Sequence, residues 1–588
     1  MTSPGAPRRP RPLAAAALLG VLLLSSCAPT SEAPEEGPAQ SGPDAQEEAA
    51  QAEAQRQAEA AQEREAALAG PSPEHQDRAS AIVAEYSTEE LAGAVLVGEF
   101  ASTDASAMAA LIEELHLAGS IIMGDNVPRG PQGVDTEALA AELQTLAEAG
   151  AEREVPPMIS VDQEGGLVTR VGAPLTEWPA PMAYGAAALS ETGGSADQTE
   201  AELDDDALTR SGHRFLAAEL QELGFTASFA PNGDVTVGAA DPTIGSRSFG
   251  DDAEAVSELA LSGLRGLAEG GLAGSIKHFP GHGSVTEDSH QTLPVQDASL
   301  EELRSRDWVP FAEAADAGVP MVMMGHIEVP ALEAGTPSSL SAAAYAELRD
   351  LGHDGVVVTD ALNMGAIVQG YGGDQAAVLA LAAGADLLLM PADVRGAHAG
   401  IVAAVESGEL DRSRVTAAAE RVVALQLWQR DLASGELAAG PGAEDPEHPG
   451  RPEELDSAEE TAEALGRSSI TLVEGRCEAD LAANGLQIVG GTEQDRSRLA
   501  AAAQAQGIAV GEGAVVNLIG ESAAAGGDVA VALDRPEVLT AADAPTRIAL
   551  YGRTPESFQA LAEVLAGGEA AGALPVAVGE EQRGHSSC

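Results

Sequence analysis

The chain has 588 residues, which is room for two or three ordinary domains, and 44% of them are hydrophobic, which is ample for large cores. Its 93 acidic and 31 basic side chains give a formal charge of -62. This charge argues against a nucleic-acid binder, which needs a basic face, and against direct adhesion to anionic lipid.

The N-terminus has the order of a bacterial targeting signal. Three arginines within residues 8–11 precede an apolar run over 13–24, which is too short to cross a bilayer comfortably. The sequence LSSC ending at Cys27 is similar to a lipobox, in which the cysteine is acylated and becomes the mature N-terminus. We therefore predict a signal peptide over 1–27 and an extracytoplasmic protein anchored to the bacterial cell membrane through a lipid on Cys27. An ordinary signal peptide that happens to contain a cysteine is the alternative.

Residues 28–79 consist mostly of Ala, Glu, Gln and Pro, with almost no large apolar side chains. Such a composition buries too little apolar surface to fold alone, although Glu47 to Leu68 could form a solvated helix. We predict a low-complexity tether that lifts the next domain off a membrane.

Between about residues 80 and 430, short apolar runs alternate with Ala-rich stretches long enough for crossover helices. Continuous apolar strands alternating with helices are typical of a parallel sheet covered on both faces. This pattern predicts an α/β fold, specifically a (β/α)8 TIM-type barrel, with a doubly wound open sheet as the alternative. The apolar runs are 94–98, 120–124, 158–162, 225–231, 275–279, 321–325, 356–360 and 386–390.

Polar residues cluster at the ends of these runs, which favours the barrel. Asp162 ends the third run, Lys277 and His278 lie in the fifth, and Asp360 ends the seventh. Barrel active sites are built from the C-terminal ends of the strands, and buried ionisable groups are costly unless they are used or paired. His326, just after the sixth run, is interpreted as a structural histidine.

The remainder of the chain predicts a linker over 431–465, rich in Gly, Pro, Glu and Ala, and a smaller doubly wound α/β domain over 466–588 without chemistry of its own. Two thiols, Cys477 and Cys588, are no disulfide framework in so long a chain, so a bridge between them is possible but not indicated. The apolar runs of this domain are 469–473, 486–490, 514–520, 529–533, 547–552 and 574–579.

The segment IKHFPGHGSVTEDSHQTLP (276–294) is the richest in chemistry. Its histidines could bind zinc, but Pro280 and Gly281 remove the helix that would give the spacing of His278 and His282 a meaning. Asp288 and His290 stand two positions apart in the same segment.

In an extended loop, side chains two positions apart point the same way, so the Asp288 carboxylate can fix the tautomer of His290 and favour its charged form. This pairing predicts an acid/base that works near neutral pH. Asp360 would project into the barrel mouth as a carboxylate nucleophile. A nucleophile and a proton donor are the minimal set for double-displacement glycoside cleavage.

Five motifs in the barrel resemble those of glycoside hydrolase family 3, and most closely its β-N-acetylglucosaminidase branch, the NagZ-like enzymes. The likeness runs from about Leu91 to Met390. The motifs are DQEGG (162–166), GSRSFG (245–250), KHFPGHG (277–283), DSH (288–290) and VVTDALNMGAI (357–367).

The resemblance implies that Asp360 forms a covalent glycosyl-enzyme and that His290, with Asp288 as its dyad partner, is the general acid/base. It also implies a set of sugar-binding residues and no metal or organic cofactor. The implied substrate-binding residues are Asp162, Arg170, Arg247, Lys277 and His278.

The resemblance further implies release of terminal β-linked N-acetylglucosamine from muropeptides, other peptidoglycan-derived fragments or chitin-like oligosaccharides. A phosphorylase is one alternative, because a neutral histidine lets an anion approach the intermediate. A non-catalytic, lipid-anchored sugar-binding protein is the other. The chain departs from the family pattern at Leu167, where many relatives carry arginine, and in the acidic stretch 196–206, which looks like an insertion.

Overall fold

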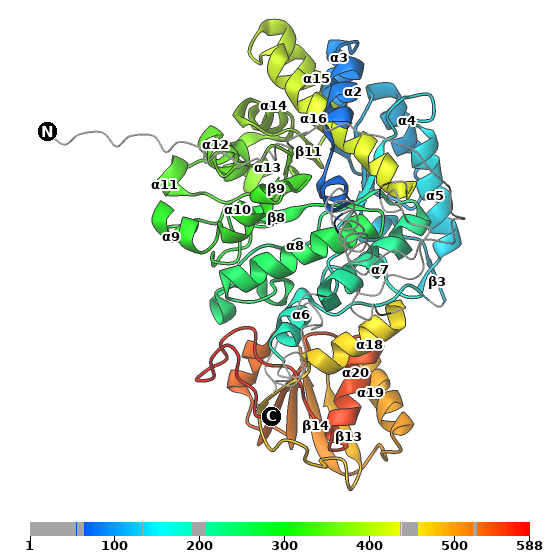
Figure 1. The fold of residues 1–588 in the computed structure, drawn as a ribbon, viewed down its shortest axis with the longest axis vertical. Helices are drawn as coiled ribbons and strands as arrows, with labels where there is room; N and C mark the ends of the chain where they lie inside the picture. Colours follow the sequence, from blue (N-terminus) through cyan, green and yellow to red (C-terminus); the bar gives the residue numbers. More distant parts are fainter. Residues whose placement is uncertain are drawn as a thin grey trace, which may run out of the picture. The chain divides into compact units, whose positions relative to one another are not determined.

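The computed structural model describes residues 55, 64–131, 133–190, 207–435, 437, 455, 457–520 and 526–588 (Figure 1). The signal peptide, Cys27, most of the tether, most of the linker and the insertion at 196–206 lie outside the described residues. In the part that is described, no helix combines the length and the apolar character needed to cross a membrane.

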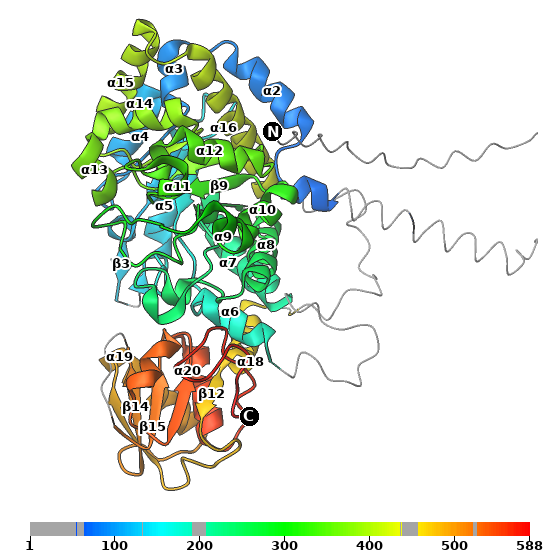
Figure 2. The ribbon, with the colours of Figure 1, turned by 90° about the vertical axis from the view of Figure 1, so that its left-hand side faces the viewer.

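Parallel strands form a closed ring in the described part between residues 96 and 389, and helices lie around these strands in both views (Figures 1 and 2). Each strand pairs with the next, with two variations: β8 continues β7, and Val358 of β10 bridges to Leu387, just before β11. Strand β11 then closes the ring on β1. The ring confirms the barrel and excludes the open sheet. Its strands are β1 (Leu96–Gly98), β2 (Gly119–Ile122), β5 (Met158–Val161), β6 (Ala227–Ser228), β7 (Ala273–Gly274), β8 (Ile276–Phe279), β9 (Met321–Met324), β10 (Val356–Thr359) and β11 (Leu388–Leu389).

Helices surround the strand ring, and side-chain caps set the first turn of several of them. In α8, for example, the Asp252 carboxylate accepts the Ala255 N–H at 3.0 Å, and Val256, Leu259 and Leu267 face the core. The helices are α2 (Pro73–Val83), α3 (Thr88–Gly93), α4 (Ser106–Leu115), α5 (Thr136–Glu148), α6 (Pro181–Ala188), α7 (Ala207–Leu223), α8 (Ala253–Glu269), α9 (Leu300–Ser305), α10 (Val309–Asp316), α11 (Pro330–Glu333), α12 (Ala342–Asp350), α13 (Gly365–Tyr371), α14 (Gly373–Ala383), α15 (Val394–Ser407) and α16 (Arg412–Ala433).

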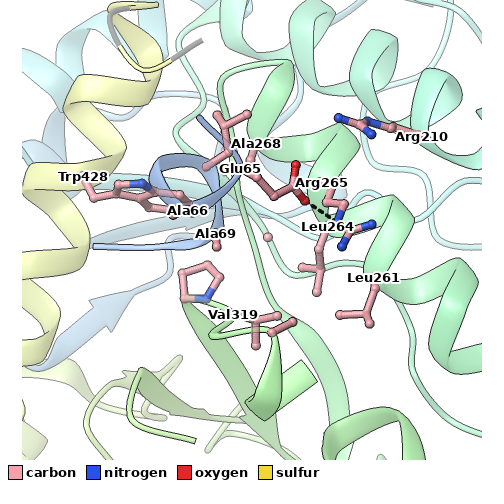
Figure 3. A pocket seen from close by; sticks show the side chains of 14 residues that line it. Glu65, Ala66, Ala69, Arg210, Leu261, Leu264, Arg265, Ala268, Val319 and Trp428 are labelled. Carbon is pink, nitrogen blue, oxygen red and sulfur yellow. Dashed lines mark ion pairs between the residues drawn. The ribbon is translucent and has the colours of Figure 1, made fainter. Parts of the chain in front are cut away.

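The last residues of the predicted tether pack under the barrel rather than extending into solvent. Leu68 is only 6% exposed, and the Trp428 indole N–H donates to the Ala67 carbonyl at 2.8 Å. Glu65 and Arg265 form an ion pair of 2.7 Å beside a cavity of about 270 Å³ at the N-terminal ends of the strands (Figure 3). The composition of this segment predicted that it would not pack against a domain. A single leucine is nevertheless enough to attach it, because the apolar base of the barrel can bury that side chain.

The C-terminal domain has a mostly parallel five-stranded sheet in the order β12-β16-β15-β14-β13, as the α/β prediction requires. Only β12 runs antiparallel to its neighbour. The elements are β12 (Thr471–Glu474), β13 (Leu486–Gly490), β14 (Ala514–Ile519), β15 (Val529–Ala532), β16 (Thr546–Ala549), α18 (Ala458–Ser469), α19 (Glu493–Ala505) and α20 (Pro555–Leu565).

The prediction of a further strand at 574–579 is wrong. Pro575 has no N–H to donate to a sheet, and its carbonyl instead accepts the Asp251 N–H of the barrel domain at 3.2 Å. The apolar side chains Leu574, Val576 and Val578 are buried although the segment is not a strand. An apolar run of this length predicts that its side chains are buried, but it does not predict whether the segment is a strand.

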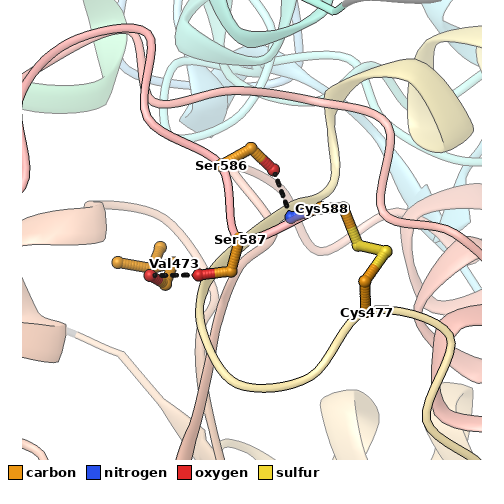
Figure 4. The surroundings of a disulfide bond; sticks show 5 residues. All are labelled: Val473, Cys477, Ser586, Ser587 and Cys588. Atoms are coloured by element: carbon orange, nitrogen blue, oxygen red, sulfur yellow. Dashed lines mark hydrogen bonds between the residues drawn. A yellow bond between two sulfur atoms is a disulfide. The ribbon is translucent and has the colours of Figure 1, made fainter.

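Cys477 and Cys588 form a disulfide, with their Cα atoms 4.9 Å apart (Figure 4). The C-terminal residues reach Cys477 because the Ser587 N–H donates to the Leu472 carbonyl at 2.7 Å and the Ser587 hydroxyl donates to the Val473 carbonyl at 3.1 Å. The bond closes a loop across 111 positions. Loop closure on this scale is worth about 4 to 5 kcal/mol in the chain-entropy account. The pairing that the sequence left open is therefore a covalent cross-link that stabilises the C-terminal domain.

Candidate active site

A cavity of about 200 Å³ opens at the C-terminal ends of the barrel strands. It gathers side chains from distant parts of the chain, such as Asp162 and Asp360, which lie 198 positions apart. Of the residues predicted for the site, only Asp288 is not in the cavity wall. The predicted residues that line the cavity are Asp162, Arg170, Arg247, Lys277, His278, His290 and Asp360.

Asp360 follows β10 directly and presents its carboxylate to this cavity. Its Oδ1 accepts the Ala361 N–H at 2.7 Å. Burial raises the pKa of Asp360, but its interactions with His326, His278, the Ala361 N–H and Lys277 outweigh burial and hold that pKa at about 2. The group is therefore an ionised carboxylate at neutral pH, the state that a nucleophile requires.

His326 supports Asp360 from behind and does not enter the cavity wall. It is fully buried, and its Nε2 donates to the Ala361 carbonyl at 2.9 Å, so its Nδ1 can accept from the Ser339 hydroxyl at 2.7 Å. Burial lowers the pKa of His326. With both ring nitrogens bonded, its geometry is that of a structural histidine.

Asp288 and His290 form a close pair at the exposed rim of the cavity. His290 Nδ1 lies 2.7 Å from Asp288 Oδ1, and the His290 backbone N–H donates to the same oxygen at 2.9 Å. Burial raises the pKa of Asp288, but the hydrogen bonds from His290 and Gln291 outweigh it and lower that pKa. Because the carboxylate can only accept, Nδ1 carries a proton and Nε2 is the nitrogen left to exchange one with a ligand.

Glu164 is the centre of a buried ionic network that sequence reasoning did not assign to the site. Its side chain is 0% exposed; it accepts two hydrogen bonds from Arg247, at 2.9 and 2.8 Å, and its carboxylate lies 2.7 Å from Lys277 Nζ. Lys277 Nζ also donates to Asp162 Oδ1 at 2.8 Å. The network therefore fixes the side chains of Arg247 and Lys277 in the cavity wall.

The charges of this network support one another. Burial raises the pKa of Glu164, but Arg247 and Lys277 outweigh it and hold that pKa well below its usual range. Burial lowers the pKa of Arg247, and Glu164 more than reverses this, so that pKa is raised. The sequence signal for Glu164 was its place in DQEGG, two positions after a strand-end aspartate.

Asp234 is the second residue that sequence reasoning undervalued. Fully buried, it accepts hydrogen bonds from His278 Nδ1 at 2.7 Å, the His278 N–H at 3.2 Å and the His282 N–H at 2.6 Å. Because Asp234 holds Nδ1, the His278 Nε2 is the ring nitrogen that remains for a ligand in the cavity. None of the motifs singled out in the sequence contains Asp234.

The three histidines of the segment have three different partners and do not converge on one point. His278 bonds to Asp234, His282 Nε2 lies 2.9 Å from the Ser289 hydroxyl, and His290 bonds to Asp288. The described residues contain no cluster that could hold a metal ion. His282 thereby ties the KHFPGHG loop to the DSH loop and sets where His290 stands.

Arg170 enters the cavity from a loop that folds back on itself. Gln163 Oε1 accepts the N–H groups of Arg170 and Val171 at 2.7 and 3.1 Å, and Arg170 Nη2 lies 4.0 Å from Asp162 Oδ2. Gly165 has φ of 93°, and a side chain there would come within 2.5 Å of the Pro179 carbonyl, so the turn requires glycine. Leu167 is 49% exposed on this loop.

Comparison with known proteins agrees with this geometry. The family described as "Glycosyl hydrolase family 3 N terminal domain" matches residues 88–425. A β-hexosaminidase from Chromobacterium violaceum is 33% identical over 351 residues, which cover 54% of this chain and 94% of that relative. β-Hexosaminidase A from Pseudoalteromonas piscicida is 29% identical over 340 residues, and the match covers 54% of this chain and 54% of that relative.

A solved structure extends the similarity into the C-terminal domain. It is a glycoside hydrolase family 3 β-N-acetylglucosaminidase from Paenibacillus sp. str. FPU-7, with a TM-score of 0.71 and 30% identity over 83% of this chain and 98% of that one. The chain spans about half the length of the Pseudoalteromonas relative. Since the family match covers more than half of the chain and contains every residue of the candidate site described above, the chain belongs to glycosyl hydrolase family 3 and is a glycoside hydrolase.

Proposed function

We propose that the protein releases terminal β-linked N-acetylglucosamine from peptidoglycan-derived or chitin-like oligosaccharides with retention of configuration. The observation that carries this proposal is the single cavity shared by an ionised Asp360 and the His290 ring of the Asp288 pair. A cavity of about 200 Å³ suits one sugar ring better than an internal stretch of polymer, which favours attack at a chain end. The Chromobacterium and Paenibacillus relatives point to the same class of sugar.

In the first step, an Asp360 carboxylate oxygen attacks the anomeric carbon and the bond to the leaving oxygen breaks. His290 gives its Nε2 proton to that oxygen as it leaves. In the second step, Nε2 takes a proton from water, the resulting hydroxide displaces the Asp360 carboxylate, and the β configuration is restored. Asp288 stabilises the charged imidazole that gives the proton in the first step and that forms again in the second.

Recognition of the sugar is assigned to the fixed wall of charges. Arg247 and Lys277 offer donors held in place by Glu164, while Asp162 accepts hydroxyl protons. Arg170 supplies further donors from the loop after β5, and His278, next to Lys277 in β8, offers its Nε2. Because these groups are already positioned, little ordering entropy is lost when the sugar binds.

The direct test is a comparison of chromogenic substrates with the purified protein. We expect release from a β-N-acetylglucosaminide and at least roughly a hundredfold lower kcat/KM on the corresponding β-glucoside, which lacks the acetamido group that the site would bind. The anomer released first should be β, as followed by proton NMR. Absence of turnover would instead support the alternative of a sugar-binding protein, provided that calorimetry still detects sugar binding.

Hydrolysis is favoured over phosphorolysis by the charge balance of the site. Lys277 and Arg247 both form close ion pairs with Glu164. Arg170, whose ion pair with Asp162 is 4.0 Å long, is the cation of the cavity wall that is held least closely by a carboxylate. At the glycosyl-enzyme, where Asp360 is an uncharged ester, phosphate would meet the carboxylate of Asp162 with little compensation. The product should therefore be free sugar with or without added phosphate, and a sugar 1-phosphate would reverse the assignment.

The role of His290 predicts an effect that depends on the leaving group. In His290→Ala, kcat/KM should fall by on the order of 10²- to 10⁴-fold for a disaccharide, whose leaving oxygen needs a proton. The loss should be much smaller for a nitrophenyl glycoside, whose leaving group departs as a stable anion. Initial rates on both substrates check this, and equal losses on the two would contradict proton donation by His290.

We also propose that the protein is extracytoplasmic and anchored through a lipid on Cys27. The proposal rests on the basic and apolar order of residues 8–24, on the LSSC sequence, and on the Cys477–Cys588 disulfide, since disulfides persist in oxidising compartments. Cys27→Ser should then move the protein from the membrane fraction to the soluble fraction. Unchanged fractionation would leave no role for a lipid at this position.

A further inference from the structure

The C-terminal domain contacts the loop that carries Arg247. We call residues 234–250, between β6 and α8, the Arg247 loop. On its inner side, Asp241 accepts the N–H groups of Thr243, Ile244 and Gly245 at 3.0, 2.8 and 3.0 Å. These bonds give the loop a defined internal shape, but they do not attach it to anything outside itself.

Within the barrel, the Val237 N–H of the loop donates to the Gly283 carbonyl at 2.9 Å. The attachment from the C-terminal domain comes from Arg535, which precedes the 3-10 turn Pro536–Ala541. Its Nη2 donates to the Gly238 carbonyl at 3.2 Å. Its guanidinium also lies against the backbone two residues before Arg247: a side chain on Gly245 would come within 3.0 Å of Arg535 Nε. Gly245 has φ of 49°, so this close approach and the backbone conformation both call for glycine.

A buried carboxylate holds Arg535 in this place. Glu537 is 9% exposed, and its Oε2 lies 3.8 Å from Arg535 Nε. Its Oε1 faces Gly238, at 3.6 Å from the position that a Cβ would occupy there. Arg535 therefore sits between a carboxylate of its own domain and two points on the Arg247 loop.

A second contact closes the far end of the loop. The Pro575 carbonyl accepts the Asp251 N–H at 3.2 Å, and the Ala577 N–H donates to Asp251 Oδ2 at 3.2 Å. A Cβ on Gly250 would lie 2.8 Å from the same Pro575 carbonyl. The C-terminal domain thus contacts both the start and the end of the segment that presents Arg247.

We propose that the C-terminal domain acts on catalysis through Arg535, a positioning residue that holds the Arg247 loop in its sugar-binding conformation. Arg535 does not line the cavity; its effect passes through Gly245 and Arg247 to Glu164, and from Glu164 to Lys277. A loop freed from Arg535 would present Arg247 in several conformations, and the sugar would then bind only to the competent fraction. This inference rests on the proposed function for its kinetic readout but not for its structural one.

The test compares Arg535→Ala with Arg547→Ala in the full-length protein. Arg547 is a matched control, since it is similarly half-buried (29% against 23% exposed side chain) and forms its ion pair within its own domain, to Glu474. We expect Arg535→Ala to raise KM for the β-N-acetylglucosaminide roughly tenfold, with kcat within about threefold of wild type. Arg535→Lys should recover part of the loss, and Arg547→Ala should match wild type in KM.

Hydrogen exchange supplies a readout that needs no substrate. Amide protection of residues 238–247 should fall in Arg535→Ala and stay unchanged in Arg547→Ala. Unchanged protection and unchanged KM would overturn the proposal, as would an equal rise in KM in both variants. If wild type itself releases no N-acetylglucosamine, the proposed function fails, and the exchange data still decide whether Arg535 orders the loop.

Discussion

Replacing Asp360 by alanine is expected to lower kcat/KM by roughly five orders of magnitude while the protein stays folded. Among the carboxylates in the cavity wall, Asp360 is the one that is held ionised, with a pKa of about 2, and is not in an ion pair with Lys277 or Arg247. Removing it removes the covalent intermediate, and no neighbouring group can replace it, because Asp162 and Glu164 are committed to Lys277. Initial rates on a chromogenic β-N-acetylglucosaminide measure the effect.

An external nucleophile makes this prediction specific to the proposed role. In Asp360→Ala, azide can enter the space of the lost carboxylate, attack the anomeric carbon from the opposite side to the leaving group, and yield an α-glycosyl azide. Asp354→Ala, an exposed aspartate shortly before β10, is the matched control and should keep wild-type rates. Residual activity above about 1%, or rescue that yields the β-azide, would assign the nucleophile to another residue.

Replacing Glu164 by glutamine is expected to lower the free energy of unfolding by about 3 to 5 kcal/mol, the usual range for breaking a buried ion pair. The substitution keeps the shape of the side chain but leaves Arg247 and Lys277 without their shared counter-charge in the protein interior. The sugar-binding wall should loosen as well, so KM should rise. Thermal and urea unfolding at neutral pH measure the stability, with the exposed Glu152→Gln as the control.

The same variant should change the pH dependence of stability. The pKa of Glu164 in the folded protein lies well below its ordinary value of 4.5. Its ionised form therefore stabilises the fold fully above pH 4.5, and this contribution is lost as pH falls below that value towards the folded pKa. Wild type should lose stability over this range, and Glu164→Gln should lose less. Parallel acid unfolding curves would show that Glu164 is not the group that titrates.

The dyad of Asp288 and His290 and the strand-end residues Asp360 and Lys277 could be predicted from sequence because each is local. A carboxylate two positions from a histidine meets it whatever the surroundings, and a polar residue that ends an apolar strand must point into the mouth of a barrel. The eight apolar runs likewise predicted the ring, since the pattern of strand and crossover helix needs no long-range information.

The roles of Glu164 and Asp234 in the site could not be predicted in this way. Each role depends on a partner far away in the sequence, Arg247 at 83 positions from Glu164 and His278 at 44 positions from Asp234. The same is true of the segment 574–579, whose apolar run is satisfied by burial against other residues instead of by a sheet. The pairing of Cys477 with Cys588 depends on where the C-terminal residues lie, and spacing alone says nothing about that.

The sequence by itself determined the class of fold, the family motifs and the chemical types that meet at the strand ends, because periodicity and short motifs express local physics. Only the tertiary structure decided which charges neutralise one another in the cavity wall and which loop of the C-terminal domain touches the Arg247 loop. Both depend on distances between residues far apart in the chain, and Coulomb energies and hydrogen bonds follow those distances and not the order of residues.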